Sequence, residues 1–407
     1  MTRVACLDIG SSSMAVAISD SEAGIRPTVF GTAWVPAAGV ERGTIVDLPA
    51  AGRSLAAALE AAERDAGCRV GEAILAIGGQ CLQADQRRGR LTLGREPVRI
   101  TRKHASRAVN SVVAAGAAAG CEFVHVIPRR FWLDGQHLAR NPLGMPATSL
   151  EVETHAISAD SADLRNALRC VQDQGLNVKE VVAAPLAAGE ALLTPQEREA
   201  GVLLLDLGAA STGVLVYTQG TPAVTLSVPL GGRQITGDVA MVLRVSLRQA
   251  ERLKLSYGRA IAASIPDQLL EVPDDEAIGV DPISHRLLCD VVEARLEEIF
   301  EHVMRAIAET GFAEPLPSGI VLTGGGAALP DVDALARRLF ALPARVATVR
   351  LGGDAAGAVA PSWASIAGLL RWLQRGQPDL LPEAGSTRRA GTPVGRFVRQ
   401  WLPLGGE

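Results

Sequence analysis

Two short segments of this chain share one pattern, in which an aspartate is followed, one residue later, by a run of small residues. The first segment consists of Asp8 and then Gly10, Ser11, Ser12 and Ser13. The second begins 198 residues later and consists of Asp206 and then Gly208, Ala209, Ala210 and Ser211. Small side chains let backbone N–H groups approach a polyphosphate, and aspartate oxygens suit a hydrated Mg²⁺ ion. Two such segments facing one another would hold a nucleotide phosphate and its metal between them, with Asp8 and Asp206 as the metal ligands.

One copy of this pattern would be explained by the end of a strand, whereas two copies in the same context favour a binding site. Each aspartate ends an apolar run, residues 4–9 and residues 202–207, and a second apolar run follows each turn. We therefore predict two strand–turn–strand units. A third segment follows the apolar residues 319–322 and consists of Gly324, Gly325 and Gly326. Glycine runs also form ordinary turns, but in this order the segment would let a base or ribose lie against the backbone.

The remaining elements divide the chain into parts that would position these units. Helical spacing predicts helices at residues 55–66, 101–119, 285–308 and from about 331, and apolar runs predict strands at 73–77 and 123–128. We assign residues 1–82 and 161–200 to a first lobe, 83–160 to a small α+β insertion and 201–375 to a second lobe, with a mostly helical part at 232–315. A linker at 376–391, rich in turn formers and charges, leads to a final segment at 392–407.

Composition indicates a globular chain and gives no sign of a nucleic-acid partner. Of 407 residues, 48% are hydrophobic and 21% are charged, with a net charge of −4. The six cysteines form no C-x-x-C pair, so we expect reduced thiols, most of them in the core. We find no signal peptide and no run of the roughly 20 apolar residues that a membrane-spanning helix needs. We therefore expect a protein that is neither exported nor integral to a membrane.

The final segment has the pattern of a short amphipathic helix. Its apolar positions follow the i, i+3, i+4, i+7, i+8 spacing of one helix face and are Val394, Phe397, Val398, Trp401 and Leu402. Arg396 and Arg399 lie on the remaining surface. A cationic helix with aromatic residues on its apolar face suits an anionic bilayer surface, although the face could also dock on the protein's own body or on a partner. The polar linker argues against self-docking. One such helix would bind a membrane weakly, so stable attachment would need many copies on one polymer.

The order of the two aspartate turns and the glycine segment resembles the phosphate-1, phosphate-2 and adenosine motifs of the actin-like ATPase superfamily. Within it the chain resembles the FtsA cell-division family, on residues 43–48, 125–128, 141–144, 193–199 and 319–325. The resemblance implies an α/β fold with two actin-like lobes, each ribonuclease-H-like, together with the insertion and the C-terminal helix. It implies ATP and Mg²⁺ as cofactors, with further nucleotide contacts from Gly232 and from Glu251 and Lys254, which lie three apart on one helix face. Without the resemblance, the last two would be read as an exposed ion pair.

The same resemblance implies partners and a location. The family polymerises head to tail and ties FtsZ filaments to the cytoplasmic face of the inner membrane at the division site. Arg295 matches a family residue at the surface that receives the C-terminal peptide of FtsZ, and an arginine suits an acidic peptide. The insertion at 83–160 would contact neighbouring subunits or other division proteins.

Both phosphate motifs depart from the family pattern. Ser13 stands where the family often has a lysine, Ala209 and Ala210 replace two glycines, and Gly213 replaces a second aspartate. Each added Cβ crowds a phosphate and disfavours a positive φ, and loss of a cation and a carboxylate weakens phosphate binding and positioning of water or metal. We expect at most a weak ATPase and assign no catalytic residue.

Three other functions remain open at this point. A sugar kinase or phosphatase on the same fold would need a further catalytic carboxylate, and none beyond Asp8 and Asp206 is evident. A PilM-type adaptor of a pilus or secretion machine would lack the linker and amphipathic segment. A degenerate, non-hydrolysing nucleotide-binding scaffold would fit the altered motifs.

Overall fold

The two strands that end in the aspartates, β1 (Arg3–Ile9) and β14 (Val202–Leu207), each form the middle of a five-stranded sheet. The computed structural model describes residues 3–20, 27–266, 268–270, 282–352 and 358–374. In the first sheet the order is β13 (Asn177–Ala183), β6 (Glu72–Ile77), β1, β2 (Ser13–Asp20) and β3 (Val29–Pro36). In the second it is β18 (Ala344–Val346), β17 (Ile320–Thr323), β14, β15 (Thr212–Thr218) and β16 (Thr221–Val228).

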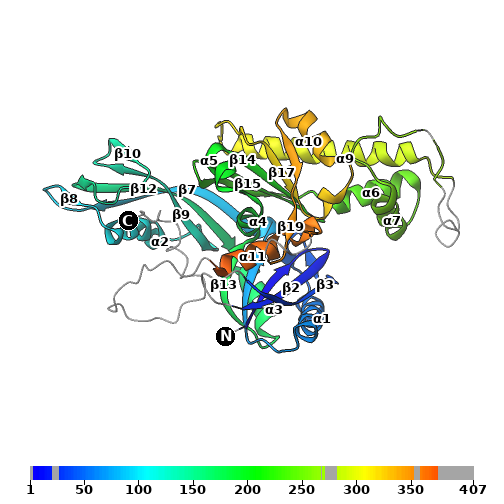
Figure 1. Ribbon diagram of the computed structural model, residues 1–407, viewed down its shortest axis with the longest axis horizontal. Helices are drawn as coiled ribbons and strands as arrows, with labels where there is room; N and C mark the ends of the chain where they lie inside the picture. Colours follow the sequence, from blue (N-terminus) through cyan, green and yellow to red (C-terminus); the bar gives the residue numbers. More distant parts are fainter. Residues whose placement is uncertain (1–2, 21–26, 267, 271–281, 353–357, 375–407) are drawn as a thin grey trace.

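The two sheets have the same topology. Each middle strand pairs antiparallel with the strand that follows it in the chain and parallel with a strand reached by a crossover. The next strand outward continues the antiparallel side, and the last strand continues the parallel side. The fold is therefore two similar lobes, as the repeated sequence pattern predicts, and Figure 1 shows the first below the second.

Alternation of side chains explains why β1 is apolar from Val4 to Leu7. In β1, Ala5 and Leu7 belong to one hydrophobic core, and Val4 and Cys6 belong to a second core on the opposite face. Helices α1 (Leu48–Ala66) and α3 (Ser161–Gln172) lie over the first face, and α11 (Ala364–Gln374) lies over the second. Because both faces are covered, no polar residue is needed until the strand reaches Asp8.

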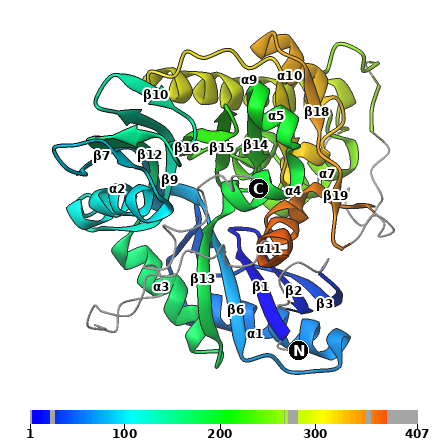
Figure 2. The same ribbon diagram turned by 60° about the vertical axis from the view of Figure 1, so that its left-hand side comes forward.

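Helices α4 (Ala184–Leu192) and α11 pack against each other at the junction of the lobes (Figure 2). The two backbones approach so closely that a Cβ added to Gly368 would lie 1.8 Å from the carbonyl oxygen of Ala187. Real Cβ atoms do not come so near to a backbone atom, so only glycine allows this crossing. α11 thereby packs on the first sheet, and α4 lies between it and strands β14 and β15 of the second.

Residues 82–160 form a separate sheet that extends from the lobes. Its strands are β10 (His137–Ala139), β9 (Cys121–Leu133), β12 (Ser149–Asp160) and β7 (Leu82–Thr92), and α2 (Arg102–Ala115) packs on one face. The short strands β8 (Val98–Arg99) and β11 (Pro146–Ala147) pair at its far end. The predicted strand at 123–128 is longer than expected, and the predicted helix at 101–119 ends at Gly116, where φ is +80°.

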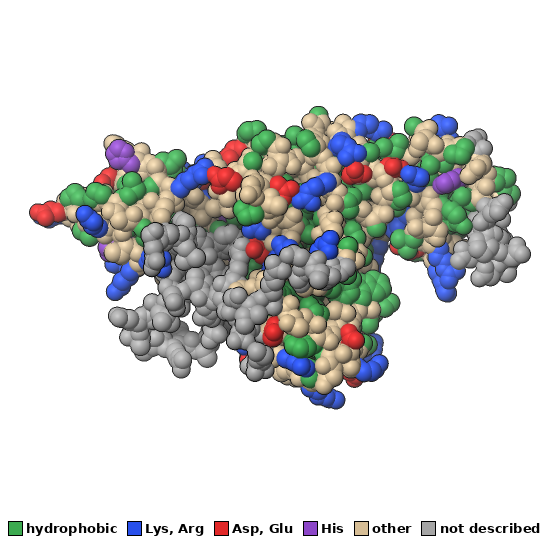
Figure 3. All heavy atoms as spheres, in the orientation of Figure 1, with side chains coloured by type: hydrophobic (Ala, Val, Ile, Leu, Met, Phe, Trp, Pro, Cys, Tyr) green, Lys and Arg blue, Asp and Glu red, His purple; other side chains and the backbone are tan. Residues whose placement is uncertain are grey.

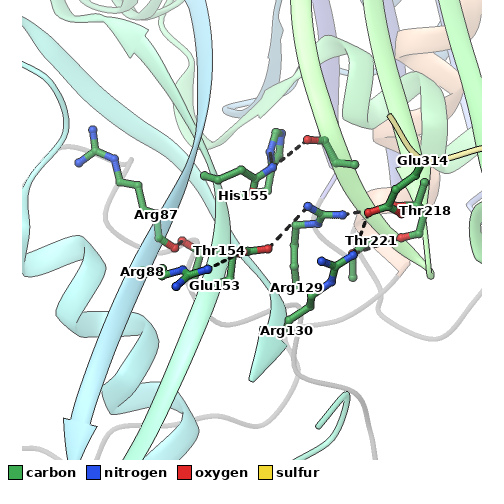
Figure 4. A network of polar contacts seen from close by, with 12 residues as sticks. Arg87, Arg88, Arg129, Arg130, Glu153, Thr154, His155, Thr218, Thr221 and Glu314 are labelled. Atoms are coloured by element: carbon green, nitrogen blue, oxygen red, sulfur yellow. Dashed lines mark hydrogen bonds and ion pairs between the residues drawn. The ribbon is translucent and has the colours of Figure 1, made fainter. Parts of the chain in front are cut away.

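Side chains from this inserted sheet reach the second lobe (Figure 4). The Nε2 atom of His155 lies 2.9 Å from the hydroxyl oxygen of Thr225 on β16, and Arg130 forms a 2.8 Å ion pair with Glu314. Gln86 donates to the carbonyl oxygen of Ala223 at 2.8 Å. The insertion is therefore attached to the second lobe as well as continuous with the first.

The second lobe carries most of the remaining helices. They are α6 (Gly232–Leu243), α7 (Leu247–Tyr257), α9 (His285–Glu309) and α10 (Val332–Phe340). The short helix α5 (Pro195–Ala200) lies within the range that we assigned to the first lobe, and it packs against β15 of the second. Three short helical turns occupy Gly79–Cys81, Gly325–Ala328 and Pro361–Trp363, and two further strand pairs are β4 (Val40–Glu41) with β5 (Thr44–Ile45) and β19 (Val349–Arg350) with β20 (Ala358–Val359). The expected helix at 55–66 begins earlier because Asp47 caps its N-terminus and accepts a hydrogen bond from Ala50 N.

Several expectations concern the chain as a whole. All six cysteines are unpaired thiols, as expected, and four of them are buried. Within the described residues, no helix combines the length and the hydropathy needed to cross a bilayer. Acidic and basic side chains are interspersed on the face that Figure 3 shows. The linker at 376–391 and the amphipathic segment at 392–407 lie outside the described residues, so both stay predictions.

Candidate functional site

The two predicted turns have the same backbone hydrogen bond. Gly10 N donates to Ser13 O at 3.0 Å, and Gly208 N donates to Ser211 O at 3.0 Å. A Cβ added to Gly10 would lie 2.9 Å from the Ser13 oxygen, and one added to Gly208 would lie 2.7 Å from the Ser211 oxygen. Both positions therefore require glycine because of close backbone approach, and neither has a positive φ.

The two aspartates interact electrostatically across the junction of the lobes. Burial and the negative charge of Asp206 raise the pKa of Asp8 to about 7, while a hydrogen bond from Ser365 opposes the shift. Burial raises the pKa of Asp206 to about 6. Each residue as a whole is half-buried. Two carboxyl groups that resist ionisation together are a favourable place for a divalent cation, which relieves their repulsion.

The glycine segment lies directly against the second aspartate. Gly324 has a φ of +84°, and a Cβ there would lie 2.3 Å from Asp206 Oδ1 and 2.7 Å from Leu207 O. Gly326 also faces Leu207, whereas Gly325 is exposed and has no neighbour that its Cβ would meet within 4 Å. The structure thus brings the second and third sequence motifs together.

The second turn is also joined to three residues of helices α6 and α7, which are Gly232, Glu251 and Lys254. Gly232 N donates to Gly208 O at 2.9 Å, which joins the start of α6 to the second turn. Lys254 is buried, and its Nζ donates to Gly232 O at 3.2 Å, to Thr236 Oγ1 at 2.9 Å and to Glu251 Oε2 at 2.7 Å. Lys254 is therefore not part of the exposed ion pair that the sequence alone would suggest. Its ammonium group holds Gly232 beside the second turn.

Arg233 and Ser365 join the site although no sequence motif points to them. The backbone N of Arg233 donates to Ala209 O at 2.7 Å, and its guanidinium donates to Ser11 O in the other lobe. Ser365 is buried at the start of α11 and contacts Asp8. The Arg233–Ser11 and Ser365–Asp8 contacts each join residues more than 200 positions apart, and no local sequence pattern signals such a contact.

Comparison with known proteins places the chain in a family. A family profile described as "Cell division protein FtsA" matches residues 203–368, and one described as "SHS2 domain inserted in FTSA" matches residues 79–158. Cell division protein FtsA of Borreliella burgdorferi is 30% identical over 406 residues, covering 97% of this chain and 98% of its own. The chain belongs to the FtsA family. The FtsA protein of Bacillus subtilis is 32% identical over 343 residues, covering 84% of this chain and 78% of its own.

Solved structures share the fold at lower identity. The PilM–PilN type IV pilus biogenesis complex matches with a TM-score of 0.63 and 16% identity, covering 91% of this chain and 98% of that one. MreB5 of Spiroplasma citri bound to ADP matches with a TM-score of 0.54 and 13% identity, covering 91% of this chain and 95% of that one. These likenesses establish the two-lobed actin-like fold. The likeness to PilM is one of fold, whereas the sequence relationship is to FtsA cell division proteins.

The structure changes how two departures from the FtsA family pattern are interpreted. Neither Ala209 nor Ala210 has a positive φ, so the second turn holds both alanines without backbone strain. Gly213 lies opposite Asp206 in the strand pairing, and a Cβ there would be 3.4 Å from the Asp206 Cβ. The turn does not need a positive φ at either alanine, and the crowding of a phosphate by their methyl groups stays a prediction.

Arg295 lies on α9 and is already paired within the protein. Its guanidinium bonds to both carboxylate oxygens of Asp238 and, at 2.6 Å, to Glu298. The side chain is about one-quarter exposed (24%), so part of its surface stays accessible. An incoming acidic peptide would compete with these two carboxylates.

The described residues contain no group of three or more His, Cys, Asp or Glu side chains that could hold a metal ion by themselves. Asp8 and Asp206 form a pair. Mg²⁺ commonly takes one or two protein carboxylates and completes its coordination with water and phosphate oxygens. The donor set therefore fits a cation that arrives with a nucleotide.

Proposed function

We propose that the protein binds ATP with Mg²⁺ between its lobes, polymerises head to tail and tethers FtsZ filaments to the cytoplasmic face of the inner membrane at the division site. The observation that carries the proposal is the duplicated turn, with one aspartate on each copy and the glycine segment beside the second. Family membership makes it a cell-division actin-like protein, and the finer steps are our proposal.

The nucleotide would lie among the residues brought together by both lobes. The turn residues Gly10, Ser11, Ser12, Ser13, Gly208, Ala209, Ala210 and Ser211 would face the phosphates. Asp8 and Asp206 would hold Mg²⁺, which would neutralise phosphate charge. Gly232 and the segment of Gly324, Gly325 and Gly326 would lie near the nucleoside, with Glu251 reaching the ribose and Lys254 supporting it.

We propose slow or absent ATP hydrolysis. The second aspartate of the family pattern is absent at Gly213, and the first turn carries Ser13 in place of a lysine. Hydrolysis needs a group that positions the attacking water and cations that stabilise the developing charge. ATP would then act mainly as a ligand that holds the two lobes in one arrangement.

Attachment to the membrane would come from residues 392–407, joined to the lobes through 376–391. These segments follow α11, the helix that packs at the lobe junction. The FtsZ C-terminal peptide would dock on the helical part of the second lobe near Arg295, and the insertion at 83–160 would contact neighbouring subunits or other division proteins.

The proposal is tested by measuring ATP affinity, filament formation on anionic lipid monolayers and sedimentation with anionic vesicles. Wild type is expected to bind Mg-ATP, to form filaments on the monolayer and to pellet with vesicles of phosphatidylglycerol and phosphatidylethanolamine. Trp401→Glu places a charge on the apolar face and should abolish pelleting.

Trp34→Glu is a matched control, because Trp34 is 50% exposed on β3 and is not part of the tail. It should pellet like wild type. Rapid turnover that depends on a small acceptor molecule would contradict the tether and favour a kinase. Full pelleting of the Trp401→Glu variant would contradict the membrane assignment.

A further inference from the structure

Arg233 contacts both of the turns that follow Asp8 and Asp206. It is the second residue of α6, so its backbone belongs to the second lobe, where its N–H donates to Ala209 O at 2.7 Å. Its guanidinium crosses to the first lobe and donates to Ser11 O. One residue therefore contacts the two turns that are related by the internal duplication.

The two turns otherwise lack positive charge. Neither residues 9–13 nor residues 207–213 contain a lysine or arginine, and Asp8 and Asp206 add negative charge. Lys254 lies nearby but is buried against Glu251. A cation from the protein would stabilise a polyphosphate at this place in addition to the metal and the backbone N–H groups.

The guanidinium of Arg233 remains available for a stronger partner. Arg233 is exposed. Within the described parts of the chain its guanidinium forms one hydrogen bond, to the neutral carbonyl oxygen of Ser11, and no ion pair. Arginine has five N–H donors, and its hydrogen bonds to charged oxygens are roughly twice as strong as those to neutral ones. A phosphate oxygen would therefore compete well with Ser11 O for these donors.

We propose that Arg233 is the cation that binds the β- and γ-phosphates of the nucleotide. It would take the place of the lysine that the family often has at the position of Ser13. This inference rests on the proposed nucleotide site and adds a residue that no sequence motif assigns to it. In the nucleotide-free protein the same guanidinium holds the two turns together through Ser11 O. Arg233 would thereby make the protein bind nucleoside di- and triphosphates more tightly than monophosphates.

The test compares fluorescent analogues of ATP, ADP and AMP, each titrated with Mg²⁺ present, in wild type and in Arg233→Gln. The variant should bind the ATP and ADP analogues at least about tenfold more weakly, because a charge-assisted hydrogen bond is lost. The AMP analogue, which has the same base and ribose, should lose less than about twofold. Arg233→Lys should fall between wild type and Arg233→Gln.

Two further variants separate a phosphate contact from a general effect of charge or folding. Arg248→Gln on α7 removes an exposed arginine of the same lobe and should leave all three affinities unchanged. Adding Ser13→Lys to Arg233→Gln should recover most of the lost ATP affinity by placing the cation on the first turn.

Each outcome decides the inference. Equal ATP affinity in wild type and Arg233→Gln would overturn it, as would an equal loss for AMP, ADP and ATP, which indicates a structural role. Failure of Ser13→Lys to recover affinity in a variant that melts normally would also contradict it. If wild type itself binds none of the three analogues, the proposed nucleotide site fails instead.

Discussion

At the scale of single residues, the glycines of the site are required by close backbone approach in some places and by backbone conformation in others. Gly10 and Gly208 have ordinary φ values, and a carbonyl oxygen fills the place of a Cβ. Gly324 meets both conditions, since its φ is +84° and its absent Cβ leaves room for the Asp206 carboxylate. Gly325, one residue later, meets neither condition. This contrast gives a matched pair of substitutions.

Gly324→Ala should therefore destabilise the protein by about 3 kcal/mol, because the new methyl would combine a strained φ with a clash at Asp206. It should also abolish nucleotide binding. Gly325→Ala should change the free energy of unfolding by less than about 0.5 kcal/mol, since its Cβ meets open space. Urea denaturation of both variants measures the difference, and equal destabilisation would show that the close contact at Asp206 is not what requires Gly324.

A pH-dependent contribution to stability comes from Glu180. Its carboxyl accepts a 2.6 Å hydrogen bond from Trp372 Nε1 of α11, and burial raises its pKa from 4.5 to about 7. The folded state then holds this proton more tightly than the unfolded chain. The contribution of Glu180 is therefore fully present below pH 4.5 and is lost as the pH rises to about 7.

The glutamine of Glu180→Gln stays neutral and still accepts the hydrogen bond from Trp372. The variant should therefore be more stable than wild type by about 1–2 kcal/mol at pH 8. This is less than the whole pKa shift of Glu180 would give, because the residue keeps some solvent contact. The gain should be smaller at pH 5. Denaturation at both pH values provides the measurement, with Glu60→Gln at an exposed position of α1 as the control. A gain of the same size at both pH values would exclude titration of Glu180 as its cause.

At the scale of elements, the contact between α4 and α11 joins the two lobes. It depends on Gly368, whose missing side chain lets the helix backbone reach Ala187. Gly368→Ala should destabilise the protein by about 3 kcal/mol or more, because a backbone must move. Gly237, a glycine inside α6 with open space at its Cβ, is the control, and Gly237→Ala should stabilise by up to about 1 kcal/mol. Thermal denaturation measures both, and a neutral Gly368→Ala would contradict the tight crossing.

The inserted sheet is fixed to the second lobe by a chain of hydrogen bonds around His155. The Nε2 atom of Gln86 lies 3.2 Å from Nδ1 of His155, and since an amide nitrogen only donates, Nδ1 accepts and Nε2 donates to Thr225. Burial is the main cause that lowers the pKa of His155 to about 3, so the ring is neutral near pH 7. The stability that this neutral ring supports is present above pH 6.5 and is lost as the pH falls toward 3.

Thr225→Val keeps the shape of the side chain but leaves the buried N–H of His155 without its acceptor. We expect a loss of about 1–2 kcal/mol in the free energy of unfolding. Thr225→Ser keeps the hydroxyl and should lose less than the valine variant. Chemical denaturation compares the two, and the reverse order would mean that packing of the methyl group, and not the hydrogen bond, holds the insertion to the second lobe.

At the scale of the whole molecule, the proposed membrane attachment depends on assembly. One tail with five apolar residues and a few arginines would bind reversibly, whereas tails on one filament bind together because each later contact is intramolecular. Pelleting of full-length protein with anionic vesicles should therefore rise more steeply with protein concentration than a simple hyperbola. It should also weaken between 50 and 300 mM salt (about a 2.4-fold change in Debye length), because screening reduces the contribution of the arginines. A hyperbolic curve without salt dependence would contradict attachment through assembled cationic tails.

The duplicated architecture is readable from local patterns in the sequence. The spacing of apolar residues before Asp8 and Asp206, and the small residues after them, are local patterns, and local patterns specify strands and tight turns. The order of the motifs then indicated an actin-like fold, and the FtsA resemblance that the comparisons confirm rests on further local segments. The amphipathic pattern at 392–407 is of the same kind.

Which side chains meet depends on how the elements pack in three dimensions. Arg233 reaches Ser11 across 222 positions, Lys254 is buried beneath Gly232, and Arg295 is paired with Asp238, 57 positions away. No periodicity encodes these contacts, because each depends on how separately formed elements pack against one another. Packing also decided that Ala209 and Ala210 are unstrained and that Gly324 must stay a glycine, since the free energy of each position depends on backbone atoms contributed by distant strands.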